Sequence, residues 1–151
     1  MSTSLSAPDL TQRAPRSPRT RLGGFVILPR LLDKGRAHLA GKSGAYIFNS
    51  SLDKRFFSLV KIDFEALLVQ LKEGKGDGEI LAWINENAGY KPGDWEIAQW
   101  SAYQEGRVAT TLRARENAAK QLATLAPERA DVITGFDFLE LDDFVSFGGK
   151  A

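Results

Sequence analysis

One stretch decides the fold class of this 151-residue chain, and it runs Phe25-Val-Ile-Leu-Pro-Arg-Leu-Leu-Asp-Lys-Gly-Arg-Ala-His-Leu39. Pro29 suits the first turn of a helix, where its missing N–H has no partner to lose. After it, apolar residues recur at the intervals of three and four that place them on one side of an α-helix. The members of this apolar stripe are Leu28, Leu31, Leu32, Gly35 and Leu39. The stretch therefore predicts an amphipathic helix.

The same period recurs in later segments. Residues 64–71 are the clearest case, because their apolar side chains also recur at intervals of three and four. A longer stretch over residues 93–125 shows this period and is expected to break near Gly106. Pro127 ends it, and we expect a short helix through Val132, followed by an acidic, aromatic tail. The side chains expected to cap helices are Ser51 or Asp53, Asp63 and Asp77.

An all-α fold follows from this periodicity. No segment of the sequence alternates apolar and polar residues over the length of a convincing strand, and no internal repeat is visible. We predict a single compact domain of about six helices over residues 12–151, preceded by a flexible N-terminus over residues 1–11. The domain is expected to start with an extended, arginine-rich segment, because Pro15 and Pro18 favour extended backbone. A chain of this length can bury enough apolar surface to fold without disulfides.

Composition excludes several chemistries. The chain has no cysteine and one histidine, His38. Thiolate metal centres, disulfides and cysteine nucleophiles are therefore ruled out, as is a metal site that needs several histidines from one chain. We accordingly expect neither a metal nor a cofactor. The apolar runs are too short for a membrane helix and the start of the chain lacks a signal-peptide pattern, so we expect a cytoplasmic protein without membrane contact.

Charge is distributed unevenly along the chain. The net charge is only +1, which argues against a dedicated nucleic-acid-binding protein. Residues 1–42, however, contain eight lysine and arginine residues against two aspartates, a net charge of +6, and the remainder carries −5. We favour the interpretation that these two parts attract each other within the fold. The alternatives are that the basic quarter binds an anionic ligand or a nucleic acid.

The basic quarter and the residues just after it supply a candidate binding site. Positive side chains are combined there with phenol, amide and carboxylate groups that would orient a ligand. The candidate cationic ligand-binding residues are Arg16, Arg19, Arg30, Lys34 and Arg36. The candidate orienting residues are Tyr46, Asn49 and Asp53. This combination predicts binding of an anionic small molecule or of a partner protein.

An enzymatic alternative depends on two residues of the first helical stretch. His38 or Asp33 would act as general base, while arginines would hold a phosphate- or carboxylate-bearing substrate. The simpler interpretation, which we favour, is an amphipathic helix with local Arg30–Asp33 and Asp33–Arg36 pairs and a half-exposed imidazole. The enzymatic hypothesis requires His38 or Asp33 to face the same cleft as Arg30, and the simpler interpretation does not.

Features outside the basic quarter carry further expectations. Arg115 falls on the apolar side of its predicted helix with Leu112 and Leu122, so it must extend to solvent or pair with an internal carboxylate. The glycine-rich turn over residues 74–78 lacks the preceding strand and the Lys-Ser/Thr pair of a phosphate loop, and the end of one helix before the next explains it. The aromatic residues expected either in the core or on a homodimer surface are Trp83, Trp95, Trp100 and Tyr103.

Several short motifs resemble those of a known protein family. They are Pro15-Arg-Ser-Pro-Arg19, Leu22-Gly-Gly-Phe-Val-Ile-Leu-Pro-Arg30, Asp33-Lys34, Tyr46-Ile-Phe-Asn49 and Leu52-Asp-Lys-Arg-Phe56. Together they are similar to the opening of a bacterial family classified only as a domain of unknown function. The resemblance covers most of the chain from about residue 8. It implies no activity, cofactor or catalytic residue, but it places the arginine-rich segment and the first helix in one motif.

Three functions are therefore open at the level of sequence. The favoured hypothesis is a non-enzymatic helical module that binds an anionic small molecule or a partner protein. The second is a small enzyme acting on a phosphate- or carboxylate-bearing metabolite. The third is nucleic-acid binding through the arginine-rich segment, which would weaken steeply with salt. Each depends on where the fold places the basic side chains of residues 1–42.

Overall fold

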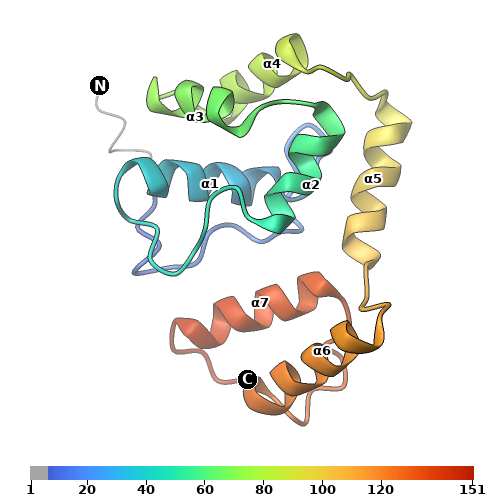
Figure 1. The fold of residues 1–151 in the computed structure, drawn as a ribbon. Coiled ribbons are helices and arrows are strands. Elements are labelled where there is room, and N and C mark those ends of the chain that lie inside the picture. The colour runs from blue at the N-terminus through green and yellow to red at the C-terminus, as the bar shows by residue number, and fades with distance from the viewer. Residues whose placement is uncertain (1–6) are drawn as a thin grey trace.

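The computed structural model describes residues 7–151, and within that range it contains seven α-helices and no strand (Figure 1). The helices are α1 (Leu28–Leu39), α2 (Ser51–Val60), α3 (Phe64–Lys72), α4 (Asp77–Asn87), α5 (Asp94–Gly106), α6 (Leu112–Leu125) and α7 (Gly135–Ser146). The predicted all-α, single-domain fold is confirmed, with seven helices in place of about six. None of the helices in the described range is long and apolar enough to cross a membrane.

α1 is buried along most of its length and forms the centre of the main apolar core. Its apolar stripe packs against side chains of α2, α3 and α4. Gly35 belongs to this stripe because α1 passes close to α3 there, and a Cβ at this position would lie 2.5 Å from Leu71 Cδ1. Leu39 is 39% exposed, in contrast to the prediction, because the helix ends beyond the core. The stripe residues without solvent contact are Leu28, Leu31 and Leu32.

The chain before α1 runs along the helical body without forming a helix of its own (Figure 1). Residues 12–21, the arginine-rich segment, contain only turns and irregular backbone, as their prolines predicted. Of the N-terminus predicted to be flexible, residues 1–6 lie outside the described range. Leu10 is buried, and its N–H donates to the carbonyl of Lys42 at 2.9 Å. The start of the described chain is thus attached to the connection that follows α1.

The helix caps differ in part from those predicted. Asp63 caps α3, as expected. α2 is capped by Ser50 rather than by Ser51 or Asp53, because Ser50 and Asp53 form a reciprocal capping box. Asp77 is the first residue of α4 rather than its cap, and its carboxylate contacts arginines from distant parts of the chain. A cap predicted from one helix alone therefore missed a tertiary contact.

The predicted break near Gly106 is confirmed, since α5 ends there and α6 begins at Leu112. α6 lies at the periphery, and none of its residues is buried. Leu112 is 73% exposed, because the face of α6 that packs on α7 carries Leu122 but not Leu112. Arg115 extends into solvent, one of its two expected outcomes, and its Nε–H donates to the carbonyl of Ala109 at 3.4 Å. The helix is therefore held from one side only.

The acidic segment near the C-terminus forms α7, a helix that the sequence analysis described as a tail. Thr134 and Asp137 close its first turn with a capping box, and Phe136 is buried. The prediction of a short helix through Val132 is wrong, because residues 126–134 form turns and irregular backbone. The acids of the predicted tail pair with Arg19 of the arginine-rich segment and with Arg30 of α1. Attraction to these cations offsets part of the repulsion between neighbouring carboxylates of α7.

The aromatic residues of the second half divide between the core and the surface. Trp83 and Trp100 pack against the main core. Trp95 and Tyr103 are exposed. Only part of the predicted aromatic set is therefore available to solvent.

Candidate functional site

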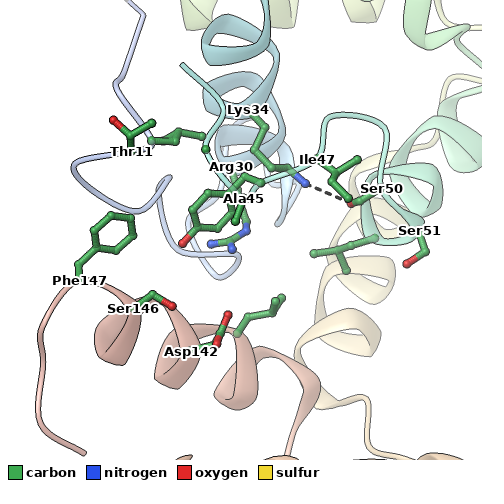
Figure 2. Close-up of a pocket in the computed structure, with 15 residues that line it drawn as sticks. Thr11, Arg30, Lys34, Ala45, Ile47, Ser50, Ser51, Asp142, Ser146 and Phe147 are labelled. Atoms are coloured by element: carbon green, nitrogen blue, oxygen red, sulfur yellow. Dashed lines mark hydrogen bonds between the residues drawn. The ribbon is translucent and has the colours of Figure 1, made fainter. Parts of the chain in front are cut away.

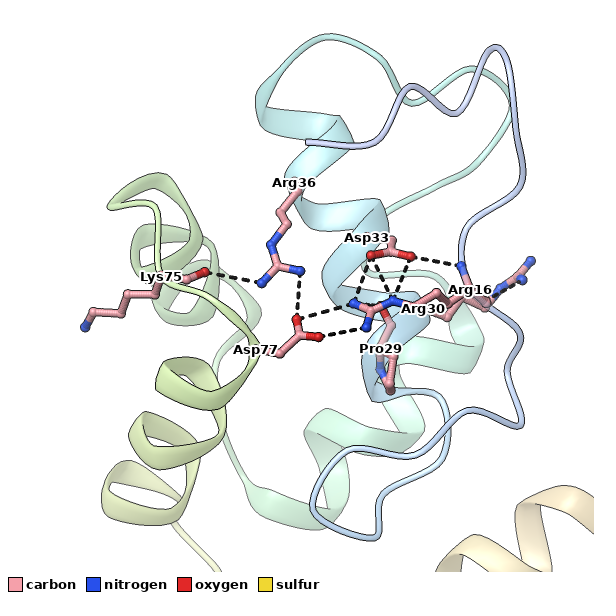
Figure 3. Close-up of polar contacts among 7 residues, drawn as sticks. All are labelled: Arg16, Pro29, Arg30, Asp33, Arg36, Lys75 and Asp77. Atoms are coloured by element: carbon pink, nitrogen blue, oxygen red, sulfur yellow. Dashed lines mark hydrogen bonds and ion pairs between the residues drawn. The ribbon is translucent and has the colours of Figure 1, made fainter. Parts of the chain in front are cut away.

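The arginine-rich segment is attached to α1 and α4 by a network of ion pairs (Figure 3). Arg16 lies between two carboxylates, with its guanidinium 3.0 Å from Asp33 and 2.7 Å from Asp77. Arg36 contacts the other oxygen of Asp77 at 2.9 Å. The hydrogen bond from Arg16 lowers the pKa of Asp77, and so does the one from Arg36, although partial burial opposes both. These contacts fix the segment on the helical core.

Arg19 joins the same segment to α7. Its guanidinium forms ion pairs with Asp137 and Glu140. It also lies over the ring of Phe136, with Cζ 5.9 Å from the ring centroid. The hydroxyl of Ser17 donates to Glu140 at 3.1 Å. The basic and acidic parts of the chain thus attract each other within the fold, which is the interpretation favoured from the sequence.

Arg30 connects α1 to α7 and is only 3% exposed. Its guanidinium is bidentate to Asp143, with N–O distances of 2.7 and 3.2 Å. The hydroxyl of Tyr46 donates to Asp143 at 2.7 Å, and Arg30 lies 5.5 Å from the centroid of the Tyr46 ring. Burial and the hydrogen bond to Asp143 raise the pKa of Tyr46, so its hydroxyl remains a donor. These three side chains form one polar cluster.

Lys34 lies one turn further along α1 and is 5% exposed. Its Nζ lies 2.8 Å from Asp53 and donates to the hydroxyl of Ser50 at 3.1 Å (Figure 2). Burial lowers the pKa of Lys34, while the negative charge of Asp53 opposes that effect. Asp53 is fully buried, and its Oδ1 has no hydrogen-bond partner within residues 7–151. A buried ion pair therefore stands at the start of α2.

A pocket of about 520 Å³ opens between α1, the connection from α1 to α2, and α7. We call it the α1–α7 pocket (Figure 2). Arg30 and Lys34 line its α1 side, and Asp142 lines its α7 side. Hydroxyl groups line it at Thr11, Ser50, Ser51 and Ser146. Apolar surface is supplied by Ile47, Leu52, Leu139 and Phe147.

Three of the eight predicted ligand-binding residues meet at this pocket, namely Arg30, Lys34 and Tyr46. Asp53 lies behind the pocket wall, where it holds Lys34. The predicted residues outside the pocket lining are Arg16, Arg19, Arg36 and Asn49. The arginines of that group are held in the ion pairs described above, and the asparagine has a left-handed backbone conformation (φ 62°) just before α2. The structure therefore divides the predicted set into two groups.

The candidate catalytic residues lie away from the pocket lining. His38 is exposed, and its ring stacks on Phe48 with 6.1 Å between centroids. Asp33 does not form the predicted local pairs in the described part of the chain. Its carboxylate instead receives the backbone N–H and the guanidinium of Arg16, because the arginine-rich segment passes over this face of α1. Neither residue therefore lines the α1–α7 pocket together with Arg30.

α7 supplies the pocket residues that the sequence analysis missed. Asp142 and Ser146 line the pocket, and Asp143 holds Arg30. Because this segment is rich in acidic and polar residues, the helical spacing of its apolar residues was not recognised. The apolar residues that recur at helical intervals are Phe138, Leu141 and Val145.

The fold and the site define an all-helical domain with a pocket of mixed polar and apolar lining between its first and last helices. The chain belongs to the family described as Domain of unknown function (DUF5069), whose model matches residues 12–145. The family resemblance noted in the sequence is thereby confirmed. No curated protein matches the chain. Within residues 7–151, no group of three or more histidine, aspartate or glutamate side chains is placed to hold a metal ion.

Proposed function

We propose that this protein is a non-enzymatic module that binds a small molecule through an anionic group in the α1–α7 pocket. The observation that carries the proposal is the placement of two buried cations, Arg30 and Lys34, in the wall of this cavity. A volume of about 520 Å³ suits a metabolite, since pockets for small molecules span roughly 300–1,000 Å³. Charged groups in such a wall bind a ligand ion more strongly than they would in water.

Both cations have hydrogen-bond donors left for a ligand. A lysine ammonium has three N–H donors, and Lys34 directs them to two partners in the described chain, Asp53 and Ser50. A guanidinium has five, and Arg30 uses three of them, for Asp143 and a backbone carbonyl. The remaining donors suit carboxylate or phosphate oxygens, which form charge-assisted hydrogen bonds with such groups.

The other predicted site residues have supporting roles in this proposal. The ring of Tyr46 packs against the guanidinium of Arg30, and Asp53 forms an ion pair with the ammonium of Lys34. Asn49 stands in the turn that leads into α2 and so positions the hydroxyl beside that ammonium. The residues that brace the surrounding fold are Arg16, Arg19 and Arg36.

A blocking variant tests the proposal directly. Ser146→Trp places an indole in the pocket from an exposed position on α7 and removes no ion pair. We expect the unfolding temperature of the wild type to rise with the concentration of a bound carboxylate or phosphate metabolite, by mass action, and this rise to disappear in the variant. Ser58→Trp, at an exposed position of α2 outside the pocket, is the matched control. Absence of a rise across an anion panel, or its persistence in Ser146→Trp, contradicts the proposal.

A second variant tests the role of the buried cation. Lys34→Met combined with Asp53→Asn removes both charges of the pair, so neither is left unpaired in the interior. The asparagine oxygen can still accept the hydrogen bond that closes the first turn of α2. We expect a folded protein with weakened anion binding, measured by calorimetry. Unchanged affinity in this double variant would show that the lysine does not contact the ligand.

Catalysis and nucleic-acid binding find less support. A general base would have to stand beside the bound ligand, and neither His38 nor Asp33 lines the pocket. A nucleic-acid surface would need accessible guanidinium groups, and Arg16 and Arg19 are engaged by internal carboxylates. We therefore assign neither a reaction nor a nucleic acid to this protein.

A further inference from the structure

We propose that the ligand of the α1–α7 pocket is dipolar, with an anionic group that binds Lys34 and Arg30 and an ammonium group that binds Asp142. This inference rests on the proposed function and names the class of molecule that the pocket selects. It is carried by the juxtaposition of two buried cations on α1 and a carboxylate on α7 across one cavity.

Asp142 and Asp143 are neighbours on α7 with different environments. Asp143 is buried and receives hydrogen bonds from Arg30 and Tyr46. Asp142 is half-buried and lines the pocket, and it has no hydrogen-bond or ion-pair partner for its carboxylate within residues 7–151. Successive helical residues point about 100° apart, so one carboxylate faces α1 while the next faces the cavity. The carboxylate of Asp142 is therefore available to a ligand in the pocket, whereas that of Asp143 is used to pack α7 on α1.

The charges of the pocket wall do not balance without a ligand. Arg30 is neutralised by Asp143, and Lys34 by Asp53. The charge of Asp142 is then in excess on this wall. A purely anionic ligand would gain the contacts with α1 but be repelled at the Asp142 end, whereas a ligand that also carries a cation would be attracted at both ends.

The neighbouring cavity does not supply the missing cation. Arg107 lines that cavity together with Asp142, between α6 and α7. It forms no ion pair with Asp142 in the part of the chain that the structure describes. A mobile cationic group from a ligand is therefore the partner that this carboxylate lacks.

Part of the pocket lining is apolar surface. Ile47, Leu52 and Leu139 contribute it. Figure 2 shows Lys34 on the α1 side of the cavity and Asp142 on the α7 side. Aliphatic carbon atoms of a ligand suit this apolar part of the lining. The expected ligand is a short aliphatic chain with an ammonium group at one end and a carboxylate or phosphate at the other.

Matched probes test this inference by isothermal titration calorimetry on the full chain. The first set is 5-aminovalerate, valerate and pentylamine, which share an aliphatic chain and differ in their charged ends. The second set is O-phosphoethanolamine and ethyl phosphate, which repeats the comparison for a phosphate and shows which anion the Lys34 side accepts. We expect the dipolar member of at least one set to bind about tenfold or more tightly than its anion-only partner, because it gains a partly desolvated ion pair.

A substitution of Asp142 tests whether this residue causes the preference for the dipolar probe. Asp142→Asn should remove the advantage of the dipolar probe while leaving the affinity for the anion-only probe unchanged or higher. Glu128→Gln makes the same change of charge at an exposed position outside the pocket and should leave the advantage intact. A dipolar preference that survives Asp142→Asn would overturn the inference.

The remaining outcomes separate this inference from the proposed function. Equal affinities for 5-aminovalerate and valerate, both lost in Ser146→Trp, would overturn the dipolar ligand and leave anion binding in place. Binding of pentylamine alone would overturn both. If no probe binds at millimolar concentration, the dipolar ligand is overturned, and the proposed function is then decided by the wider anion panel with the same blocking variant.

Discussion

In the α1–α4 region, apolar side chains from four helices meet around α1, whereas α7 combines apolar contacts, such as that of Phe136 with Val26 and Ile27, with carboxylates that pair with arginines. The first region contains most of the large buried side chains, and the second adds smaller apolar clusters and ion pairs to Arg19 and Arg30. Apolar burial stabilises without regard to direction, while ion pairs depend on geometry, salt and pH. We therefore expect the largest losses of stability from substitutions in the apolar core of α1–α4.

The largest expected effect is in the apolar region. Phe56 has no solvent contact and packs edge-on against Phe25, so Phe56→Ala should remove about 3–5 kcal/mol from the free energy of unfolding. Urea denaturation followed by circular dichroism measures this loss. Phe144→Ala, at an exposed position on α7, is the control and should cost less than about 1 kcal/mol. Similar losses at both positions would remove the distinction between the regions.

The second-largest loss of stability is expected when the ion pair that connects α1 to α7 is removed. Asp143→Ala leaves the guanidinium of Arg30 buried without a counter-charge, and we expect a loss of about 3 kcal/mol in the free energy of unfolding. Asp142→Ala, at the neighbouring residue, removes no internal partner and should change stability little. Equal losses for the two variants would show that the pairing with Arg30 does not hold α7.

A smaller effect is expected where the arginine-rich segment meets α7. Arg19 is partly exposed, so solvent screens its ion pairs, and Arg19→Gln should cost about 1 kcal/mol or less. The difference from wild type should shrink in molar salt, because the Debye length falls to about 3 Å. Arg129→Gln removes a surface pair with Asp131 and serves as control, with no measurable effect expected. A difference that is unaffected by salt would point to packing on Phe136 instead.

The smallest effect concerns pH. The hydrogen bond from Arg16 holds the pKa of Asp77 below its ordinary value, so the unfolded chain binds this proton more readily than the folded one. The stabilisation is therefore fully present above a pH of about 4, near the ordinary pKa, and is lost as pH falls through the lower pKa of the folded state. Urea denaturation between pH 6 and pH 3 should show a shallower decline for Asp77→Asn than for the wild type. An identical decline would contradict the role of this pair.

The apolar region was the predictable part of the fold. The stripe of α1 and the segment 64–71 follow helical spacing, and the break at Gly106 follows from local backbone preference. Such signals depend on neighbours in sequence. They were sufficient for helix positions and for the fold class, and they failed for α7, whose carboxylates find their partners far away in the chain.

The site could be predicted only in part for the same reason. Arg30, Lys34 and Tyr46, which line the pocket, were predicted as ligand-binding residues because charge and aromatic character are combined in and just after the basic quarter. Asp142 stands more than a hundred positions further along the chain than Lys34, and no local pattern pairs them. The ion pairs of Asp33 and Asp77 with Arg16 likewise arise from the path of the arginine-rich segment, which periodicity does not report.

The close approach of α1 and α3 at Gly35 also limits how this sequence can change. A Cβ there would lie 2.5 Å from Leu71 Cδ1 and 3.1 Å from Phe48 Cε1, inside a core that has little space to yield. A methyl group gained at position 35 must be offset by volume lost at position 71 or 48, so substitutions at these positions are not additive. We expect a substitution at one of positions 35, 48 and 71 to be tolerated or destabilising according to the residues at the other two, so the three positions should vary together.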